Sequence, residues 1–392
     1  MRKKTLTTML SLSFLALVFA GCAHISKRGA ADAPKADQDT ERVYAWVSGL
    51  QLENGLLESS DGSNFVSLYE NALAAIIFSA RGDLKRAEKI LDYFDRNIGE
   101  LKEAPGGFGQ FRDRDGAPLD GAPHRWLGDN AWLLIAVNNY HKIAGNNKYS
   151  KLSSALEKWI RSLQDPKDGG LWGGYDRSGK QILKSAEGII DSFNAVKGYD
   201  SFHKKILGYL KSGYWDPEKK ALLAWKEHEK YKYALDLHSW GYCAFPRMPQ
   251  RTLDEAAMFL TSKKITANGI EMTGFCFDLD HDSVWLEGTG EMVVAYRSAG
   301  RGYTADFYLD EMSKALIPGP AAKDGGLPTA GLPYATNPGT HYGAGKLWDG
   351  VDKNLSLAAS AWYLFGKMHY DPMEYGRKKG IPAGDMFWAD KK

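Results

Sequence analysis

The amino-acid sequence predicts an all-α protein in which six helical hairpins close into a ring. An acidic residue stands directly before a mostly apolar, helix-forming segment at six places, at intervals of roughly 49 to 65 residues. Amphipathic segments alternate with these apolar segments. Long loops rich in Gly and Asp lead into each apolar segment, whereas the reverse connections are short. Intervals of this length indicate a repeated supersecondary unit, and six units form a closed circle.

The apolar segments are expected to be inner helices, because apolar residues cover nearly all of their surface. The clearest is 285–296, in which Trp285 and Glu287 precede an apolar run. The acids that begin the six segments are Glu70, Asp129, Glu187, Asp236, Glu287 and Asp352. We therefore expect inner helices to start near 69, 129, 187, 236, 287 and 352.

The amphipathic segments are expected to be outer helices, because charged residues separate their apolar positions at helical spacing. The six candidates span 41–50, 84–97, 149–163, 201–212, 252–264 and 304–316. No run of alternating apolar and polar residues competes with these helices over a useful length. Since the long loops all run from an outer to an inner helix, they should lie on one rim together with the acids.

The N-terminus predicts export and lipid attachment. Residues 2–4 are basic, 10–19 are apolar but too few to span a bilayer, and Ala20-Gly21-Cys22 resembles a bacterial lipoprotein cleavage site. We expect a signal peptide over 1–21, lipidation of Cys22, a disordered tether over 22–40 and the ring over 41–392. Ala23 favours an outer-membrane lipoprotein that faces the periplasm, and plain secretion is the alternative.

The composition limits the partners. With 392 residues, 44% hydrophobic and 25% charged, and a net charge of +2, the chain shows no basic excess for a nucleic-acid partner. No cysteine or histidine motif has metal-ligand spacing, so we expect no metal or cofactor. Asp278, Asp280 and Asp282 lack the other features of a calcium loop and indicate a solvated turn. Cys243 and Cys276 stand among aromatic residues and are expected to be free thiols.

Carboxylates and aromatic rings on one rim favour a polysaccharide or oligosaccharide partner. Splitting a glycosidic bond requires a protonated acid at the leaving oxygen and a carboxylate on the other face of the sugar. Glu287 and Glu187 are the first candidates, with Asp129 and Asp191 as alternates, because Asp191 shares the helix face of Glu187. The expected substrate-binding residues are Trp126, Trp172, Tyr175, Asp236, His238, Trp240, Trp285, His341 and Trp348. Any single acid is also explained as a helix cap, Glu70 and Asp352 most readily.

These features resemble the (α/α)6 toroid of the six-hairpin glycosidase superfamily over about 41–371. The Asp-Gly-Gly turns at 168–170 and 324–326, and Trp-Leu-Glu-Gly-Thr at 285–289, are similar to sequences of its bacterial members. The resemblance implies a site at the N-terminal ends of the inner helices and inverting hydrolysis. A related pattern has His after the acid that matches Glu187, and this chain has Gly188 there.

Two other functions remain open. A polysaccharide lyase on this fold would take a proton from a uronic acid with Tyr or His and neutralise the sugar carboxylate with Arg or Lys. His124, Arg125, His238 and Tyr242 are available for that reaction. A noncatalytic glycan-binding or assembly protein would keep the aromatic residues of the rim, but no two of its carboxylates would face each other.

Overall fold

The computed structural model describes residues 37–119, 123–225, 231–321, 326–339, 341–342, 345–346 and 350–389. The predicted signal peptide, Cys22 and nearly all of the predicted tether lie outside these residues. The chain divides into two units, Met1–Asp37 and Gln38–Lys392, and the second holds every element named below. Within the described ranges, no helix combines the length and the apolar character needed to cross a bilayer.

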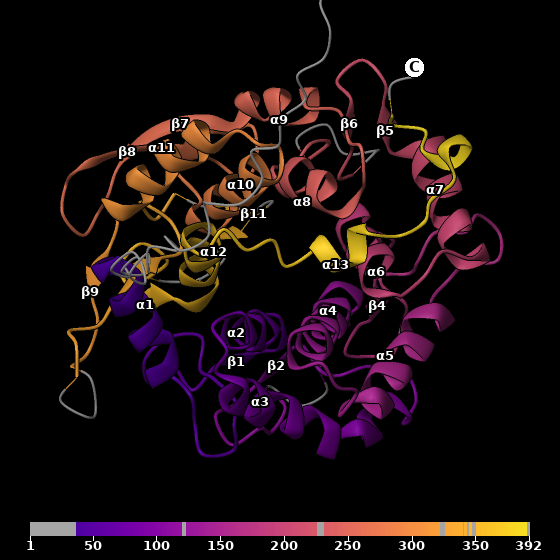
Figure 1. The fold of residues 1–392 in the computed structure, drawn as a ribbon, viewed down its shortest axis with the longest axis horizontal. Coiled ribbons are helices and arrows are strands. Elements are labelled where there is room, and N and C mark those ends of the chain that lie inside the picture. The colour runs from indigo at the N-terminus through magenta and orange to yellow at the C-terminus, as the bar shows by residue number, and fades with distance from the viewer. Residues whose placement is uncertain are drawn as a thin grey trace, which may run out of the picture. The chain divides into compact units, whose positions relative to one another are not determined.

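Six inner helices form a closed ring within the unit Gln38–Lys392 (Figure 1). They are α2 (Leu68–Ala80), α4 (Leu127–Ala144), α6 (Ala186–Ala195), α8 (Asp236–Ala244), α10 (Leu286–Ser298) and α12 (Leu357–Lys367). Each packs against the next, and α12 returns to pack against α2. Most residues of these helices are buried, because neighbours cover them on several sides. The predicted toroid is therefore confirmed.

Outer helices surround this ring. They are α1 (Gln38–Gly49), α3 (Leu84–Arg96), α5 (Ser150–Ser162), α7 (Ser201–Gly213), α9 (Arg251–Glu255) and α11 (Gly302–Ser313). Each buries one face, as α3 does with Ala87, Ile90 and Phe94. Helix α1 begins at Gln38, ahead of the predicted boundary at Glu41. The remaining short helical segments are η1 (Ile98–Leu101), η2 (Ala256–Phe259), α13 (Glu374–Arg377) and η3 (Ala383–Asp385).

The predicted outer helix over 252–264 is wrong beyond Phe259. After η2 the chain forms an antiparallel hairpin of β7 (Leu260–Lys264) and β8 (Glu271–Phe275). Asn268 and Gly269 make its turn, with Gly269 at φ 73°. An Asn-Gly pair between segments that contain Ile and Thr is a hairpin signal, which the helical spacing of 252–264 obscured.

The last inner helix starts later than predicted. Helix α12 begins at Leu357, whereas Asp352 was expected at its start and instead lies buried ahead of strand β13 (Leu355–Ser356). The Oγ of Ser356 accepts the amide of Ala359 at 3.3 Å, so a serine cap sets the first turn. Glu70 of α2 accepts the amide of Ala358 at 3.2 Å. Glu70 therefore caps a neighbouring helix.

Backbone hydrogen bonds join each unit to the following one. An amide at the start of five inner helices donates to a carbonyl in the long loop of the next unit, which satisfies an otherwise free N–H group. The five pairs, 2.9 to 3.1 Å apart, are Leu68 to Gln110, Leu127 to Gly173, Leu235 to Phe277, Leu286 to Tyr334 and Leu357 to Ser59. The last bond runs from the sixth unit to the first. It closes the ring.

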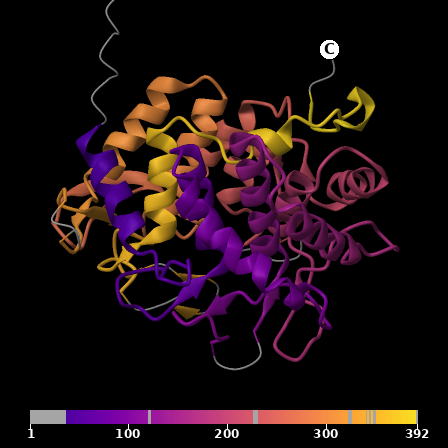
Figure 2. The same ribbon diagram turned by 60° about the horizontal axis from the view of Figure 1, so that its bottom comes forward.

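Short strands gather at the end where the inner helices begin, called here the N-terminal rim (Figure 2). The pairs are β1 (Val66–Ser67) with β2 (Phe111–Arg112), β3 (Arg125–Trp126) with β4 (Gly174–Tyr175), β5 (Trp215–Asp216) with β6 (Ala221–Leu222), and β11 (His341–Tyr342) with β12 (Gly345–Lys346). Strand β10 (Ala330–Pro333) pairs with both β9 (Ile317–Pro318) and β13. The long loops thus share one rim, as predicted.

The segment after α12, which contains α13 and η3, covers the other end of the ring, called here the C-terminal rim. It is yellow in Figure 2 and lies opposite the short strands. Helix α13 packs against α4, α6 and α8. Asn139 and Asn194, near the ends of α4 and α6, donate to the carbonyls of Pro372 and Met373 at 3.0 Å. The ring is therefore closed by chain at this end, and its N-terminal rim carries the loops.

Gly174 in β4 positions the start of α4. Its φ is 105°, and a methyl group added there would lie 1.9 Å from the carbonyl oxygen of Arg125. We expect Gly174→Ala to lower the free energy of unfolding by more than about 2 kcal/mol, because backbone must move. Gly179 has φ 81° but open space around it, so Gly179→Ala should cost only about 1 kcal/mol. Urea unfolding followed by circular dichroism measures both. Equal losses would contradict the steric account.

Candidate functional site

Seven carboxyl groups, called here the carboxyl cluster, meet where the inner helices begin. They belong to Glu70 of α2, Asp129 of α4, Glu187 and Asp191 of α6, Asp236 of α8, and Glu287 and Glu291 of α10. Glu187 and Asp236 share a hydrogen bond. The charge of at least one other member raises the pKa of Asp129, Asp191, Asp236, Glu287 and Glu291. The positive ends of the helix dipoles point toward the same place. Carboxyls that are far apart in sequence therefore form one site.

The cluster has an outer and an inner layer. Asp191 and Glu291 each stand four residues after another acid, one helical turn deeper in the ring. Glu187 is half-buried, whereas Asp191, Asp236, Glu287 and Glu291 are 2%, 2%, 5% and 1% exposed. Glu187 can therefore reach a ligand more readily than the carboxyls behind it.

Burial raises the pKa of every carboxyl in the cluster, because an ionised carboxylate is poorly solvated there. The pKa reaches about 7 for Glu70 and Asp129 and about 8 for Glu287. Neighbouring carboxylates raise the pKa of Asp191 further. Among the described residues, no ion pair links the cluster to a lysine, arginine or histidine. Several of the seven groups therefore hold a proton near neutral pH.

Glu287 is oriented by Tyr69. The Tyr69 hydroxyl donates to Glu287 Oε1 at 2.7 Å and accepts the indole N–H of Trp362 at 2.9 Å. These residues come from α10, α2 and α12, so three helices fix the geometry. The hydrogen bond favours the ionised carboxylate and offsets part of the rise that burial causes in the pKa of Glu287. Glu287 is thus held as a hydrogen-bond acceptor.

Aromatic rings fill the ring centre one turn below the helix starts. The Trp132 ring of α4 lies 5.5 Å from that of Tyr69, 5.6 Å from that of Trp240 and 5.8 Å from that of Trp362. All three tryptophans are buried. Trp240, predicted to bind substrate, therefore packs beneath the cluster. Its indole Nε1 lacks an acceptor in the part of the chain that the structure describes.

The other predicted aromatic residues occupy different places on the N-terminal rim. Trp126 and Tyr175 lie on the paired strands β3 and β4 and are half-buried. Trp285 is buried at the start of α10. His341 belongs to strand β11, but its side chain is not among the described groups, and Trp348 lies outside the described residues altogether.

Trp172 is partly covered by another side chain. The ammonium of Lys184 lies 4.6 Å from the centre of the indole ring. The same ammonium pairs with Asp165 and Asp168, each at 2.7 Å. One face of Trp172 is therefore occupied in this structure.

The residues considered for a lyase are not brought together. His238 is buried, its Nδ1 donates to the carbonyl of Ala234 at 3.1 Å, and its ring packs against Phe259 of η2. Tyr242 lines a pocket on the C-terminal rim. Arg125 donates to the carbonyl of Gly107 at 3.2 Å. His238 thus faces the outer layer, away from the carboxyl cluster.

Sequence reasoning missed Glu291, Tyr69, Trp132 and Trp362. A signal for Glu291 existed, because it follows Glu287 at the four-residue spacing that singled out Asp191. Tyr69, Trp132 and Trp362 carry no such pattern, since aromatic residues in apolar helices usually belong to a core. Only the packing of α2, α4 and α12 brings them to the carboxyls.

One group of residues outside the cluster has the chemistry to bind a cation. Ligand atoms of Cys276, Asp278 and Asp280 all lie within 4.8 Å of one another. Asp278 and Asp280 each accept an amide of their own turn at 3.1 Å. Asp278 is buried and Asp280 is exposed, so the prediction of a solvated turn is wrong for Asp278. Burial raises the pKa of the Cys276 thiol to about 11, which disfavours the thiolate form that binds metals. Cys243 and Cys276 are free thiols.

Comparison with solved structures identifies the fold. No protein-family model and no curated protein matches the sequence. A wild-type glycosidase superposes with a TM-score of 0.60 and 13% identity, over 86% of this chain and 96% of its own. A glycosidase variant in complex with glucose gives 0.59 and 12%, with the same coverage. Cellobiose 2-epimerase from Bacillus thermoamylovorans gives 0.59 and 11%, over 84% and 97%. The chain thus has the (α/α)6 toroid fold of solved glycosidases and cellobiose 2-epimerases.

Proposed function

We propose that this protein is a glycoside hydrolase that splits a polysaccharide or oligosaccharide with inversion, using Glu187 and Glu287. The observation that supports this most is the carboxyl cluster, which combines proton-holding groups with a carboxylate fixed by a hydrogen bond. Those are the two functions that glycosidic hydrolysis requires. A toroid neighbour in complex with glucose supports a sugar ligand.

Glu187 is the proposed general acid. Its hydrogen bond with Asp236 requires one proton between the two carboxyls, so the pair carries a proton that can be donated. Glu187 is the more exposed of the two and therefore the one that reaches the leaving oxygen. Asp129, half-buried with a pKa of about 7, is the alternate acid.

Glu287 is the proposed general base. The pKa of about 8 places the ionised form of Glu287 at mildly alkaline pH; in that form Tyr69 holds Oε1, and the other carboxylate oxygen can take a proton from the attacking water. Helix α8 stands between α6 and α10 in the ring, so acid and base come from helices that are not neighbours. Neighbouring helices pack roughly 8 to 10 Å apart, so α6 and α10, which α8 separates, lie farther apart than that and leave room for a sugar and a water between them. This spacing supports inversion.

A neutral or amine-bearing sugar suits the site better than an acidic one. No described cation balances the cluster, so a uronate would meet only like charge. A uronate-specific lyase needs Arg or Lys at the sugar carboxylate, and the described part of the cluster has neither. The lack of such a cation among the described residues of the site favours hydrolysis over elimination.

Removing the Tyr69 hydroxyl should test the role of Glu287. Tyr69→Phe keeps the ring packing but loses the hydrogen bond to Glu287, so the pKa of Glu287 should rise further. We expect kcat/KM to fall about tenfold and the acidic limb of its pH profile to move to higher pH. The control is Tyr93→Phe, on the outer helix α3, which loses the hydrogen bond from the Tyr93 hydroxyl to the carbonyl of Gly116. An unshifted limb in Tyr69→Phe would remove Tyr69 from the account.

We also propose that the protein acts in the periplasm from an outer-membrane lipid anchor at Cys22. Residues 1–23 of the sequence support this location. Labelled palmitate should be incorporated into the wild type and not into Cys22→Ser. Equal labelling of both would contradict the anchor.

The hydrolase proposal is tested by incubating the purified protein with a panel of bacterial envelope and exported glycans. New reducing ends should appear with at least one neutral or amino-sugar glycan and not with the Glu287→Gln variant. An epimerised disaccharide without new reducing ends would assign the site to epimerisation. Equal release by wild type and variant would exclude Glu287 as the base.

A further inference from the structure

Two pockets open near the C-terminal rim, at the ends of α8, α10 and α12. Their volumes are about 410 Å³ and about 450 Å³. Ser298 and Arg377 line both pockets, so these two residues form the wall between them. The carboxyl cluster lies where the same helices begin. These pockets are therefore separate from the proposed hydrolytic site.

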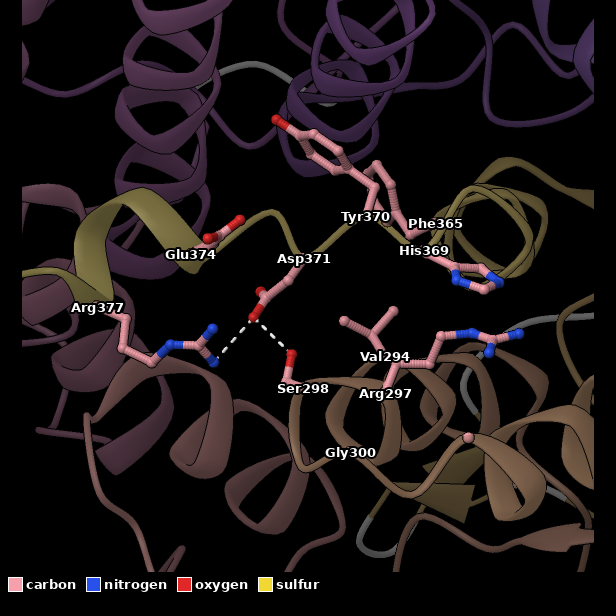
Figure 3. A pocket seen from close by; sticks show the side chains of 11 residues that line it. Val294, Arg297, Ser298, Gly300, Phe365, His369, Tyr370, Asp371, Glu374 and Arg377 are labelled. Carbon is pink, nitrogen blue, oxygen red and sulfur yellow. Dashed lines mark hydrogen bonds and ion pairs between the residues drawn. The ribbon is translucent and has the colours of Figure 1, made fainter. Parts of the chain in front are cut away.

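Asp371 fixes the wall between the pockets (Figure 3). Its Oδ2 accepts hydrogen bonds from Arg377 at 3.0 Å and from Ser298 at 2.9 Å, and its Oδ1 accepts the amide of Met373 at 2.9 Å. The charge of Arg377 is thus already balanced. Lys378 is likewise paired, with Glu374 at 2.5 Å.

Two further cations of the 450 Å³ pocket have no carboxylate partner among the described residues. Lys379 donates to the carbonyls of Asn194 and Val196, and burial lowers its pKa to about 8. Arg247 is exposed and stands at φ 61°, a left-handed conformation that a side chain other than glycine rarely adopts. Among the residues that the structure describes, no acidic side chain lines this pocket.

Helix capping explains only part of this arrangement. Lys379 bonds carbonyls at the C-terminal end of α6, where a cation complements the helix dipole. Arg247 makes no such bond among the described groups, and its backbone conformation carries a cost of about 1 kcal/mol that glycine would avoid. Tyr242, Phe245 and Met248 supply an apolar wall beside these charges. The pocket therefore joins two cations that form no ion pair with a described carboxylate to an apolar surface.

We propose that this 450 Å³ pocket binds a small molecule bearing a phosphate or carboxylate group, with Arg247 and Lys379 as its charged contacts. Guanidinium and ammonium groups are the side chains that recognise such anions. The apolar wall suits the uncharged part of a sugar phosphate or sugar acid. A free anion and a lipid headgroup share this chemistry. The proposal does not depend on the hydrolase activity.

Isothermal titration of the full chain with inorganic phosphate, glucuronate and glucose tests this proposal. We expect saturable binding of phosphate or glucuronate and none of glucose. Arg247→Gly should weaken anion binding about tenfold, because one charge-assisted contact is lost. This variant keeps a backbone that glycine prefers, so it should fold. Lys220 also stands at positive φ, 54°, and Lys220→Gly removes the same charge outside the pocket.

Each possible outcome either supports or overturns an anion site in this pocket. Binding that Arg247→Gly weakens and Lys220→Gly leaves unchanged supports the pocket. Equal weakening by both variants, or no saturable binding of either anion, would overturn it. Co-sedimentation with phosphatidylglycerol vesicles that is sensitive to Arg247→Gly would identify a lipid headgroup as the source of the anion. Because Glu287→Gln lies at the other rim, it should retain anion binding even if hydrolysis is lost.

Discussion

Glu287→Gln is expected to lower kcat by about 10²- to 10⁴-fold, the range that general acid–base catalysis contributes. The amide keeps the size of the side chain and can still accept from Tyr69, but it cannot take a proton from water. The measurement is the initial rate of reducing-end release from a responsive glycan. Glu271→Gln, at an exposed position on β8, is the matched control and should keep the wild-type rate.

Substrate choice then distinguishes the acid from the base. Glu187→Gln should lose activity on a natural glycan but keep it on an aryl glycoside, whose leaving group needs no proton. Glu287→Gln should lose activity on both, since water must still be activated. Parallel losses for the two variants on both substrates would contradict the assigned division of roles.

The folded protein is expected to lose stability as pH rises from about 4.5 to about 8. Burial raises the pKa of Glu287 from 4.5 to about 8, so in this interval the folded state holds a proton that the unfolded chain has released. The stabilisation that proton binding to Glu287 gives the folded state is complete below about pH 4.5, the pKa in the unfolded chain. It decreases as pH rises and is lost once pH passes the folded-state pKa of about 8. At about 1.4 kcal/mol per tenfold change in proton affinity, Glu287 alone contributes on the order of 5 kcal/mol.

Urea unfolding at a series of pH values measures this effect. Glu287→Gln is neutral throughout, so its free energy of unfolding should fall less steeply than that of the wild type. Glu271→Gln, whose carboxyl is exposed, should follow the wild-type curve. A wild-type stability that stays constant or rises across the interval would contradict the raised pKa values of the cluster.

The ring was predictable because its signals repeat along the chain. Inner helices such as α2 are apolar on all sides, and outer helices such as α3 only on one face, so their layers follow from pattern. The common rim follows from loop lengths. The hairpin of β7 and β8 was missed because 252–264 fits helical spacing as well as strand pairing.

The site was only half predictable, since its contacts cross the ring. Six of the seven carboxyls were named from the sequence, Glu70 among them as a helix cap, because acids before apolar helices and at helical spacing can be read directly. That Glu70 caps α12, and that Tyr69 holds Glu287, depends on the closure of the ring, which packs α2 against α12 and brings the start of α2 close to the start of α10. Gly188 illustrates the same limit. A methyl group there would lie 3.2 Å from the backbone nitrogen of Gly128, so close packing of α6 on α4 disfavours the histidine of the related pattern.

Proton NMR of the first product tests the central claim most directly. The protein is incubated with an oligosaccharide that it cleaves. The new reducing end should have the anomeric configuration opposite to that of the glycosidic bond that was split, as long as it is observed before mutarotation mixes the two anomers. A product that retains the configuration would exclude the water-activating role of Glu287. An unsaturated sugar, or a 2-epimer without cleavage, would show that the carboxyl cluster performs a different reaction.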